Sequence, residues 1–223
     1  MRGVGLVVLV SLLVGCKTTE QMTPTSHVVH VPTGARILLL EPDIKYYLVS
    51  AGGVPEPQPD WTQAARTNFV AAARDELVRQ GLVLQTVEQG TSDEDLEKYA
   101  KLHNAVASTI LDGTKLPSKS DRLDVGLGPG VSVLKERYGA DYGLFVFYVG
   151  YGSTGGRWAF AIVAAVAGVV VPTGGQGGAA SLVDLKTGEI VWFNNIAVGS
   201  GDLRNPSGAA TTVQTVFKGL PRG

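Results

Sequence analysis

The chain has 223 residues, of which 17% are charged, and its formal net charge is −1 at pH 7. This length suffices for one domain with a well-buried core and is short for two. The near-neutral charge lacks the basic excess that nucleic-acid binding requires. We therefore expect one folded domain that does not bind nucleic acid.

The N-terminus is organised like a secretory signal. After Met1 and Arg2, an apolar run continues to Gly15, with Ser11 as its only polar side chain. Cys16 follows directly and is the only cysteine of the chain. The run is too short to span a bilayer as a helix, but it has the length of a signal-peptide core.

The sequence Leu-Val-Gly-Cys at residues 13–16 resembles the lipobox of bacterial lipoprotein precursors. The resemblance implies that residues 1–15 are a signal peptide that is removed and that Cys16 is acylated. Two or three acyl chains hold a protein stably on a membrane, whereas one does not. Lys17, rather than Asp, follows the cysteine and favours delivery to the outer membrane, by analogy with enteric bacteria. The alternative is a free or disulfide-bonded cysteine, which the lack of a second cysteine disfavours.

Residues 16–34 are polar, rich in threonine and interrupted by Pro24 and Pro32, which predicts a lipidated flexible tether. A stretch of about 18 residues reaches at most about 60 Å. The domain, which we place at residues 35–223, is thus expected to stay close to its membrane.

Strand and helix patterns alternate in the first half of this domain. Residues 35–49 predict a buried strand that continues, after a kink at Pro42, as a half-exposed one. Asp60 is expected to cap a long amphipathic helix that ends before Gly81. A short strand over residues 82–87 follows.

The second half begins with a helix that we expect Ser92 to cap and that runs to about Leu111. A short helix at residues 129–138 and an apolar central strand at residues 142–148 come next. Two strands around a Lys-Thr-Gly turn then predict a hairpin, and Asn205 is expected to cap a final helix. The fold class is α/β (α+β), a single domain with a mixed sheet, helices packed on it, and a C-terminal hairpin followed by a helix.

The lipobox, the order of elements and the closing hairpin together resemble a family. The hairpin sequence Asp-x-x-Thr-Gly-x-x-Val-Trp, at residues 184–192, is its most specific part. The chain is similar to bacterial envelope lipoproteins with the α/β fold of the N-terminal domain of TolB, a group that includes CsgG and LpoB, and most similar to its uncharacterised branch. The resemblance implies a non-catalytic periplasmic domain that binds other proteins. We expect Asp184, Thr187, Gly188 and Trp192 to have structural roles.

Two glycine-rich and apolar segments allow alternative interpretations. Gly150 to Gly155 matches G-x-G-x-x-G, but the next acidic residue, Asp184, is too far for a dinucleotide site, so we expect a flexible turn at the sheet edge. Residues 158–171 are uncharged and too short to span a bilayer. They predict a helix buried on one sheet face or, alternatively, a segment within residues 157–178 that contacts a membrane or another subunit.

No pattern of catalytic or metal-binding residues is evident. His27 and His30 fall in the predicted tether, and His103 stands alone on a helix. The sequence predicts no enzyme activity, no cofactor and no metal. It predicts an outer-membrane lipoprotein whose domain faces the periplasm and binds a protein of the periplasm or outer membrane. The alternative is an oligomeric secretion or envelope-remodelling subunit.

Overall fold

A computed structural model describes residues 19–23, 29–87, 91–113, 123, 125–196 and 201–221. Cys16, His27 and the predicted signal peptide lie outside the described residues. The strands are β1 (Thr19–Met22), β2 (Arg36–Leu39), β3 (Asp43–Val49), β4 (Pro55–Pro57), β5 (Val83–Thr86), β6 (Tyr142–Ser153), β7 (Gly175–Asp184) and β8 (Ile190–Ile196). The helices are α1 (Pro59–Arg79), α2 (Glu94–Gly113), the 3₁₀ turn η1 (Pro129–Val131), α3 (Ser132–Tyr138), α4 (Gly155–Val166) and α5 (Pro206–Phe217).

One mixed sheet organises the domain, in the order β1-β8-β7-β6-β2-β5. β6 is its central strand: β2 and then β3 run parallel to successive parts of it, and β7 is antiparallel along its other side. The kink predicted at Pro42 separates β2 from β3. The structure thus confirms the predicted single α/β domain with a mixed sheet, C-terminal strands and a final helix.

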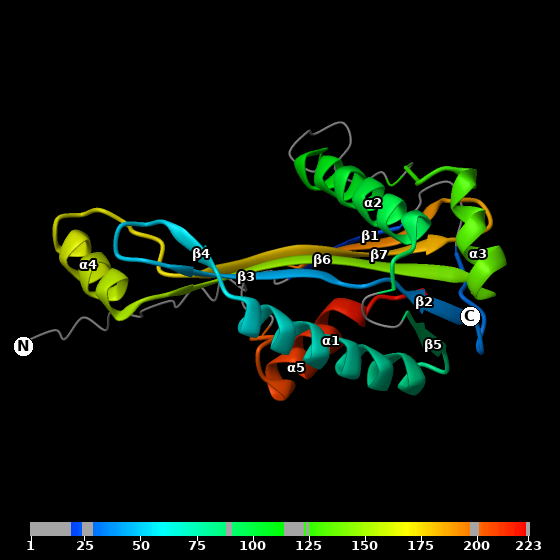
Figure 1. Ribbon diagram of the computed structural model, residues 1–223, viewed down its shortest axis with the longest axis horizontal. Helices are drawn as coiled ribbons and strands as arrows, with labels where there is room; N and C mark the ends of the chain where they lie inside the picture. Colours follow the sequence, from blue (N-terminus) through cyan, green and yellow to red (C-terminus); the bar gives the residue numbers. More distant parts are fainter. Residues whose placement is uncertain are drawn as a thin grey trace, which may run out of the picture.

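Helices cover both faces of the sheet over the body of the molecule (Figure 1). On one face, α1 and α5 bury the cluster around Phe69, Trp192 and Phe217, whose rings meet edge to face. On the other face, α2 and α3 bury a second cluster that includes Leu134, Phe145 and Phe193. These two cores hold the sheet rigidly between the two helix layers.

Helix ends follow local side-chain chemistry. Asn205 accepts a hydrogen bond from the Gly208 N–H and caps α5, as the sequence predicts. The other two cap predictions are wrong. α1 begins at Pro59, whose missing N–H suits a first helical position, so Asp60 lies inside the helix. At α2 the carboxylate of Asp93, not Ser92, accepts from the backbone N–H groups of Asp95 and Leu96.

Part of the predicted tether belongs to the sheet. Thr19–Met22 forms the edge strand β1, antiparallel to β8. Met22 and Val31 are buried, one in each core. Residues 16–34 therefore are not a tether along their whole length, and the fold begins only three residues after Cys16. A four-residue polar edge strand has too little apolar alternation to be recognised from sequence.

Candidate functional site: an exposed apolar arm

The sheet extends beyond its covering helices as an arm, which comprises residues 46–57 and 149–177. The arm contains the outer parts of β3, β6 and β7, the short strand β4 and the helix α4 (Figure 1). β6 pairs with β3 as far as Ser153 and with β7 as far as Tyr151. This three-stranded ribbon carries α4 away from the body of the protein.

Local sequence explains why α4 forms at the end of the arm. Thr154 has extended backbone, and its hydroxyl accepts a hydrogen bond of 3.2 Å from the Arg157 N–H, which caps the helix. The following residues are rich in alanine, and the helix stops before Gly168, whose φ of +78° few other residues adopt.

The prediction that residues 158–171 form a helix buried on the sheet is wrong. No residue of α4 is buried. Trp158 and Ile162, one helical turn apart, are 53% and 65% exposed, and Val166 is 88% exposed. The helix lies where the sheet has already ended, so it has no sheet face to cover. The alternative interpretation, an apolar contact surface, agrees with this placement.

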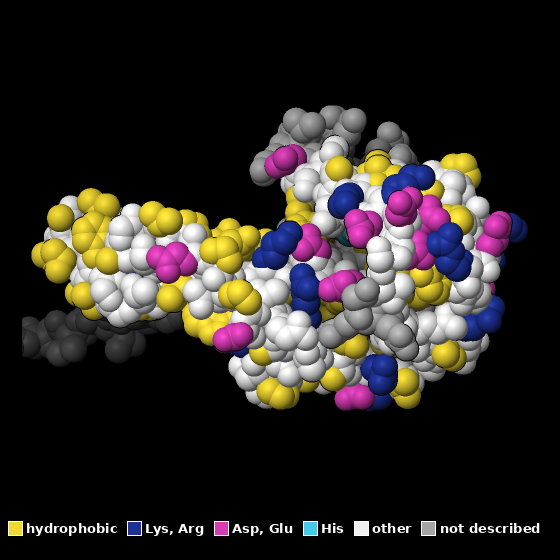
Figure 2. Space-filling view, in the orientation of Figure 1, with side chains coloured by type: hydrophobic (Ala, Val, Ile, Leu, Met, Phe, Trp, Pro, Cys, Tyr) yellow, Lys and Arg dark blue, Asp and Glu magenta, His cyan; other side chains and the backbone are white. Residues whose placement is uncertain are grey.

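The arm is almost free of charge. Glu56 and Arg157 are its only acidic or basic residues. Figure 2 shows hydrophobic and uncharged side chains over the visible face of the arm, whereas the Lys, Arg, Asp and Glu side chains gather on the body. Large apolar surfaces of this kind mark sites of contact with proteins or membranes.

Arg157 ties the helix to the rest of the arm. Its Nε donates a hydrogen bond of 2.9 Å to the carbonyl of Pro172, in the segment that returns to β7. A Cβ placed on Gly53 would lie 3.2 Å from Arg157 Nη1, so the guanidinium also adjoins the turn between β3 and β4. The basic side chain thus joins three parts of the arm tip.

Aromatic side chains lie along the ribbon below the tip. The rings of Tyr47 and Tyr151 stack with their centroids 5.6 Å apart. Tyr151 is 42% exposed, although it lies on the central strand of the sheet. Exposed tyrosine and tryptophan are typical of surfaces that meet a membrane interface or a protein partner.

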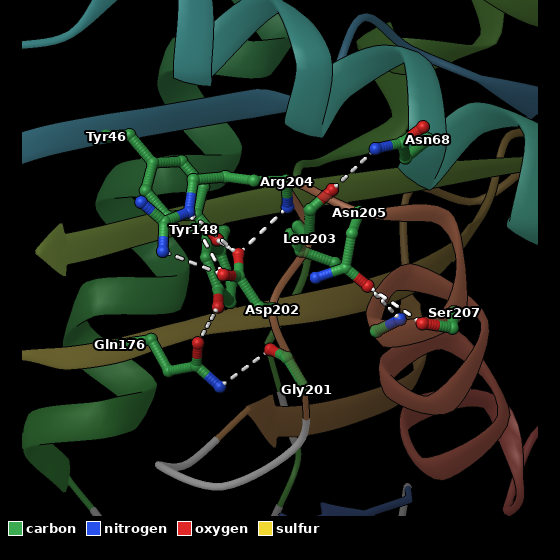
Figure 3. A network of polar contacts seen from close by, with 11 residues as sticks. Tyr46, Asn68, Tyr148, Gln176, Gly201, Asp202, Leu203, Arg204, Asn205 and Ser207 are labelled. Atoms are coloured by element: carbon green, nitrogen blue, oxygen red, sulfur yellow. Dashed lines mark hydrogen bonds and ion pairs between the residues drawn. The ribbon is translucent and has the colours of Figure 1, made fainter.

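A polar network holds the base of the arm (Figure 3). Arg204 Nη2 and Asp202 Oδ2 form an ion pair at 2.7 Å. The Tyr148 hydroxyl donates to Gln176 Oε1 at 2.6 Å, and Gln176 Nε2 donates to the carbonyl of Gly201 at 3.0 Å. These contacts connect β6 and β7 to the loop that precedes α5.

The charged pair of this network lies against aromatic rings. The Arg204 guanidinium is 4.4 Å from the ring centre of Trp61 and 5.5 Å from that of Tyr46. The hydrogen bonds from Arg204 lower the pKa of Asp202. Burial raises the pKa of both Tyr46 and Tyr148, so the two hydroxyls stay neutral. The network is therefore suited to fixing the direction of the arm.

The structure also corrects the interpretation of the glycine-rich motif. Gly150 and Gly152 lie within β6, not in a turn at the sheet edge. A Cβ on Gly150 would lie 2.4 Å from the Tyr46 ring, and one on Gly152 would lie 2.9 Å from the Trp61 ring. These glycines make room for the aromatic rings at the arm base.

His103 has partners that the sequence did not indicate. Its Nε2 lies 2.7 Å from the Ser181 hydroxyl, its ring stacks on Phe145, and its Nδ1 lies 3.4 Å from Asn104 Oδ1. A serine beside a histidine is a nucleophile arrangement in many enzymes, but Ser181 is fully buried and His103 is 1% exposed. The pair joins α2 to β7 and offers no access to a substrate.

The four hairpin residues lie far from the arm, at the opposite end of β7. Asp184 Oδ1 accepts from the N–H groups of Lys186 and Thr187, and Thr187 Oγ1 accepts from the Glu189 N–H. Gly188 has a φ of +79°, and a Cβ there would lie 2.0 Å from the carbonyl oxygen of Gly128. Trp192 is fully buried against Phe217. The hairpin and the arm are separate parts of the fold.

Sequence reasoning missed the network at the arm base. Asp202 and Arg204 fall in a loop, and Tyr46, Tyr148 and Gln176 are distant from them in sequence. No spacing rule connects these positions, because the register of β3, β6 and β7 brings them together. The alternation of tyrosine and glycine in residues 148–152 was the only local signal.

No family model and no curated protein matches this chain. Among solved structures, it is similar to the PelC dodecamer from Paraburkholderia phytofirmans, at 11% identity and a TM-score of 0.44, over 92% of this chain and 99% of that one. It is also similar to lipoprotein GNA1162 from Neisseria meningitidis, at 15% identity and 0.34, over 72% and 79%. A third match, at 16% identity and 0.34 over 77% and 87%, is the C-terminal domain of LpoB from Salmonella enterica. These similarities describe the path of the chain and assign no function.

Proposed function

We propose that this protein is a lipoprotein of the bacterial outer membrane, anchored through Cys16, that acts without catalysis by presenting its apolar arm as a contact surface. Residues 1–15 serve as the signal peptide, and the domain faces the periplasm. The observation that carries the proposal is α4, an exposed apolar helix held at the end of a rigid arm.

Two further features support a contact role. The arm is braced at its base by the network around Asp202 and Arg204, which a passive surface loop would not need. In addition, the buried His103 and Ser181 pair, the arrangement closest to a catalytic one, is closed to substrates. Within the described residues there is also no group of three or more side chains placed to bind a metal.

A second candidate is an oligomeric secretion or envelope-remodelling subunit in which α4 contacts another copy. The same exposed helix favours it, because an apolar tip is also a suitable subunit contact. The two candidates share the lipid anchor and differ in what covers the tip.

The anchor is tested by growing a Gram-negative host with an alkyne analogue of palmitate and expressing the full-length chain. We expect the wild-type protein to carry the label and to sediment with outer membranes on a sucrose gradient. The Cys16→Ser variant should lose the label and accumulate as unprocessed precursor. An unlabelled wild-type protein, or a labelled Cys16→Ser variant, would contradict the proposal.

A further inference from the structure

We propose that the tip of the arm enters the surface of the same bilayer that holds the acyl chains of Cys16. This inference rests on the proposed lipid anchor and adds to it a second membrane contact. The two contacts are brought together by the register of the sheet, because the strand that follows Cys16 begins on the side of the arm.

The register fixes where the chain enters the fold. Thr19 pairs with Ile196, Ile196 pairs with Gly178, and Gly178 pairs with Tyr148. Thr19 is therefore level with Tyr148, at the base of the arm. β1 runs from this level toward the body, so the chain before Thr19 approaches from the arm side.

The reach of the anchor is shorter than the arm. Cys16 precedes Thr19 by three residues, and three residues span at most about 10 Å. β6 continues five residues beyond Tyr148, to Ser153, which is about 17 Å at the rise of a strand. Helix α4 begins only after this. A membrane that holds Cys16 therefore meets the arm at or before its tip.

The tip has the chemistry that suits a membrane interface. Trp158, Phe160 and Ile162 are each more than half exposed, and no acidic residue occurs between Val149 and Gly177. Arg157 lies at the first turn of α4, where its charge can face lipid headgroups. Within the described residues no helix is long and apolar enough to cross a bilayer. The contact is then a shallow one, of about 5–10 Å depth.

A second copy of the chain is a poorer occupant of this surface. A 12-residue helix is about 18 Å long and about 10 Å wide, so one face offers on the order of 200 Å². Stable protein interfaces bury about 800 Å² on each partner. The tip alone is too small for such an interface, whereas membrane insertion of a short apolar helix has no minimum area and is supported by the nearby anchor.

Tryptophan fluorescence tests the inference directly. The chain has three tryptophans: Trp158 at the tip, Trp61 at the arm base and the buried Trp192. The lipidated full-length protein is reconstituted in vesicles of phosphatidylethanolamine and phosphatidylglycerol, with or without phosphatidylcholine brominated on its acyl chains. The Trp158→Phe variant gives the signal of the other two, and the difference from wild type is the emission of Trp158.

We expect brominated lipid to quench about half or more of the Trp158 emission and to leave the Trp158→Phe variant nearly unchanged, because only a shallowly inserted ring meets the bromine atoms. Ile162→Glu, on the same side of α4, should remove most of this quenching. Val78→Glu is the matched control, since Val78 is 62% exposed on α1 of the body, and it should quench like wild type.

Flotation of the same vesicles separates the two proposals. If the protein floats with the vesicles but Trp158 is not quenched, or is quenched no more than the other tryptophans, the arm inference is overturned and the anchor stands. If crosslinking then joins α4 to a second copy, the subunit contact replaces the membrane contact. If the wild-type protein neither carries acyl chains nor floats, both proposals fail.

Discussion

His103 shows how a residue that resembles a catalytic group acquires a structural role. It lies on α2 and contacts Ser181 on β7, across the interface between helix and sheet. Burial lowers its pKa to about 4, whereas a histidine in the unfolded chain has a pKa of about 6.5. The folded protein therefore holds this ring neutral over a range in which the unfolded chain would protonate it.

This difference predicts a pH-dependent stability. Between about pH 6.5 and pH 4 the unfolded chain binds a proton at His103 that the folded protein does not, so acidification favours unfolding. The free energy of unfolding should fall by on the order of 3 kcal/mol across this range from His103 alone. The His103→Gln variant, which keeps a hydrogen-bonding group, should lack this component. Urea unfolding of both proteins at pH 7, 5.5 and 4.5 checks it, and parallel curves would contradict it.

At the scale of elements, the arm depends on strands that are longer than their hydrophobic pattern suggests. The sequence predicts a strand over residues 142–148, but β6 continues to Ser153 because β3 and β7 supply hydrogen-bond partners on both sides. The added residues alternate tyrosine and glycine, which have weak local preference for a strand. Pairing and the rings of Tyr46 and Trp61 above the glycines compensate for this.

The network at the arm base should control how firmly this ribbon is held. In Arg204→Met, the ion pair with Asp202 and the contact with the Trp61 ring are lost, while the side chain keeps much of its length. We expect backbone amides of residues 148–152 to exchange hydrogen several-fold faster, with a modest change in overall stability. Hydrogen exchange measured by mass spectrometry tests this.

Arg36→Met is the matched control for that experiment. Arg36 forms its ion pair with Asp141 on the body, far along the sheet from the arm. This variant should leave exchange in residues 148–152 at the wild-type rate. Equal exchange in the two variants would mean that the network does not brace the arm.

At the scale of the whole molecule, β1 decides where the fold begins. Met22 is buried beside Phe193 in the core under α2, although the sequence pattern places it in a tether. Met22→Ala should lower the free energy of unfolding by about 2 kcal/mol and the melting temperature by about 5 °C. Thr23→Ala, an exposed neighbour, should change neither. Thermal unfolding followed by circular dichroism compares them, and equal melting temperatures would return residues 19–22 to the tether.

Much of the fold was predictable because its elements carry strong local signals. The helix after the Pro-rich loop, the turn at Gly139 and the cap at Asn205 each follow from residues within one or two turns. The arm was not predictable, because an apolar segment such as residues 158–171 has the same pattern whether it is buried or exposed. Its exposure depends on how far β6 and β7 extend, which is decided by pairing across the sheet.

The pairing of β1 with β8 also sets an order for folding. Thr19 and Ile196 are neighbours in the sheet although nearly the whole described chain separates them. Contacts between such distant residues form late, after the local strand and helix units have assembled. The strand that follows Cys16 is thus added when the rest of the chain is already available. During export, this leaves the acylation site on an unstructured segment while the modifying enzymes act, and it closes the open edge of β8 only afterwards.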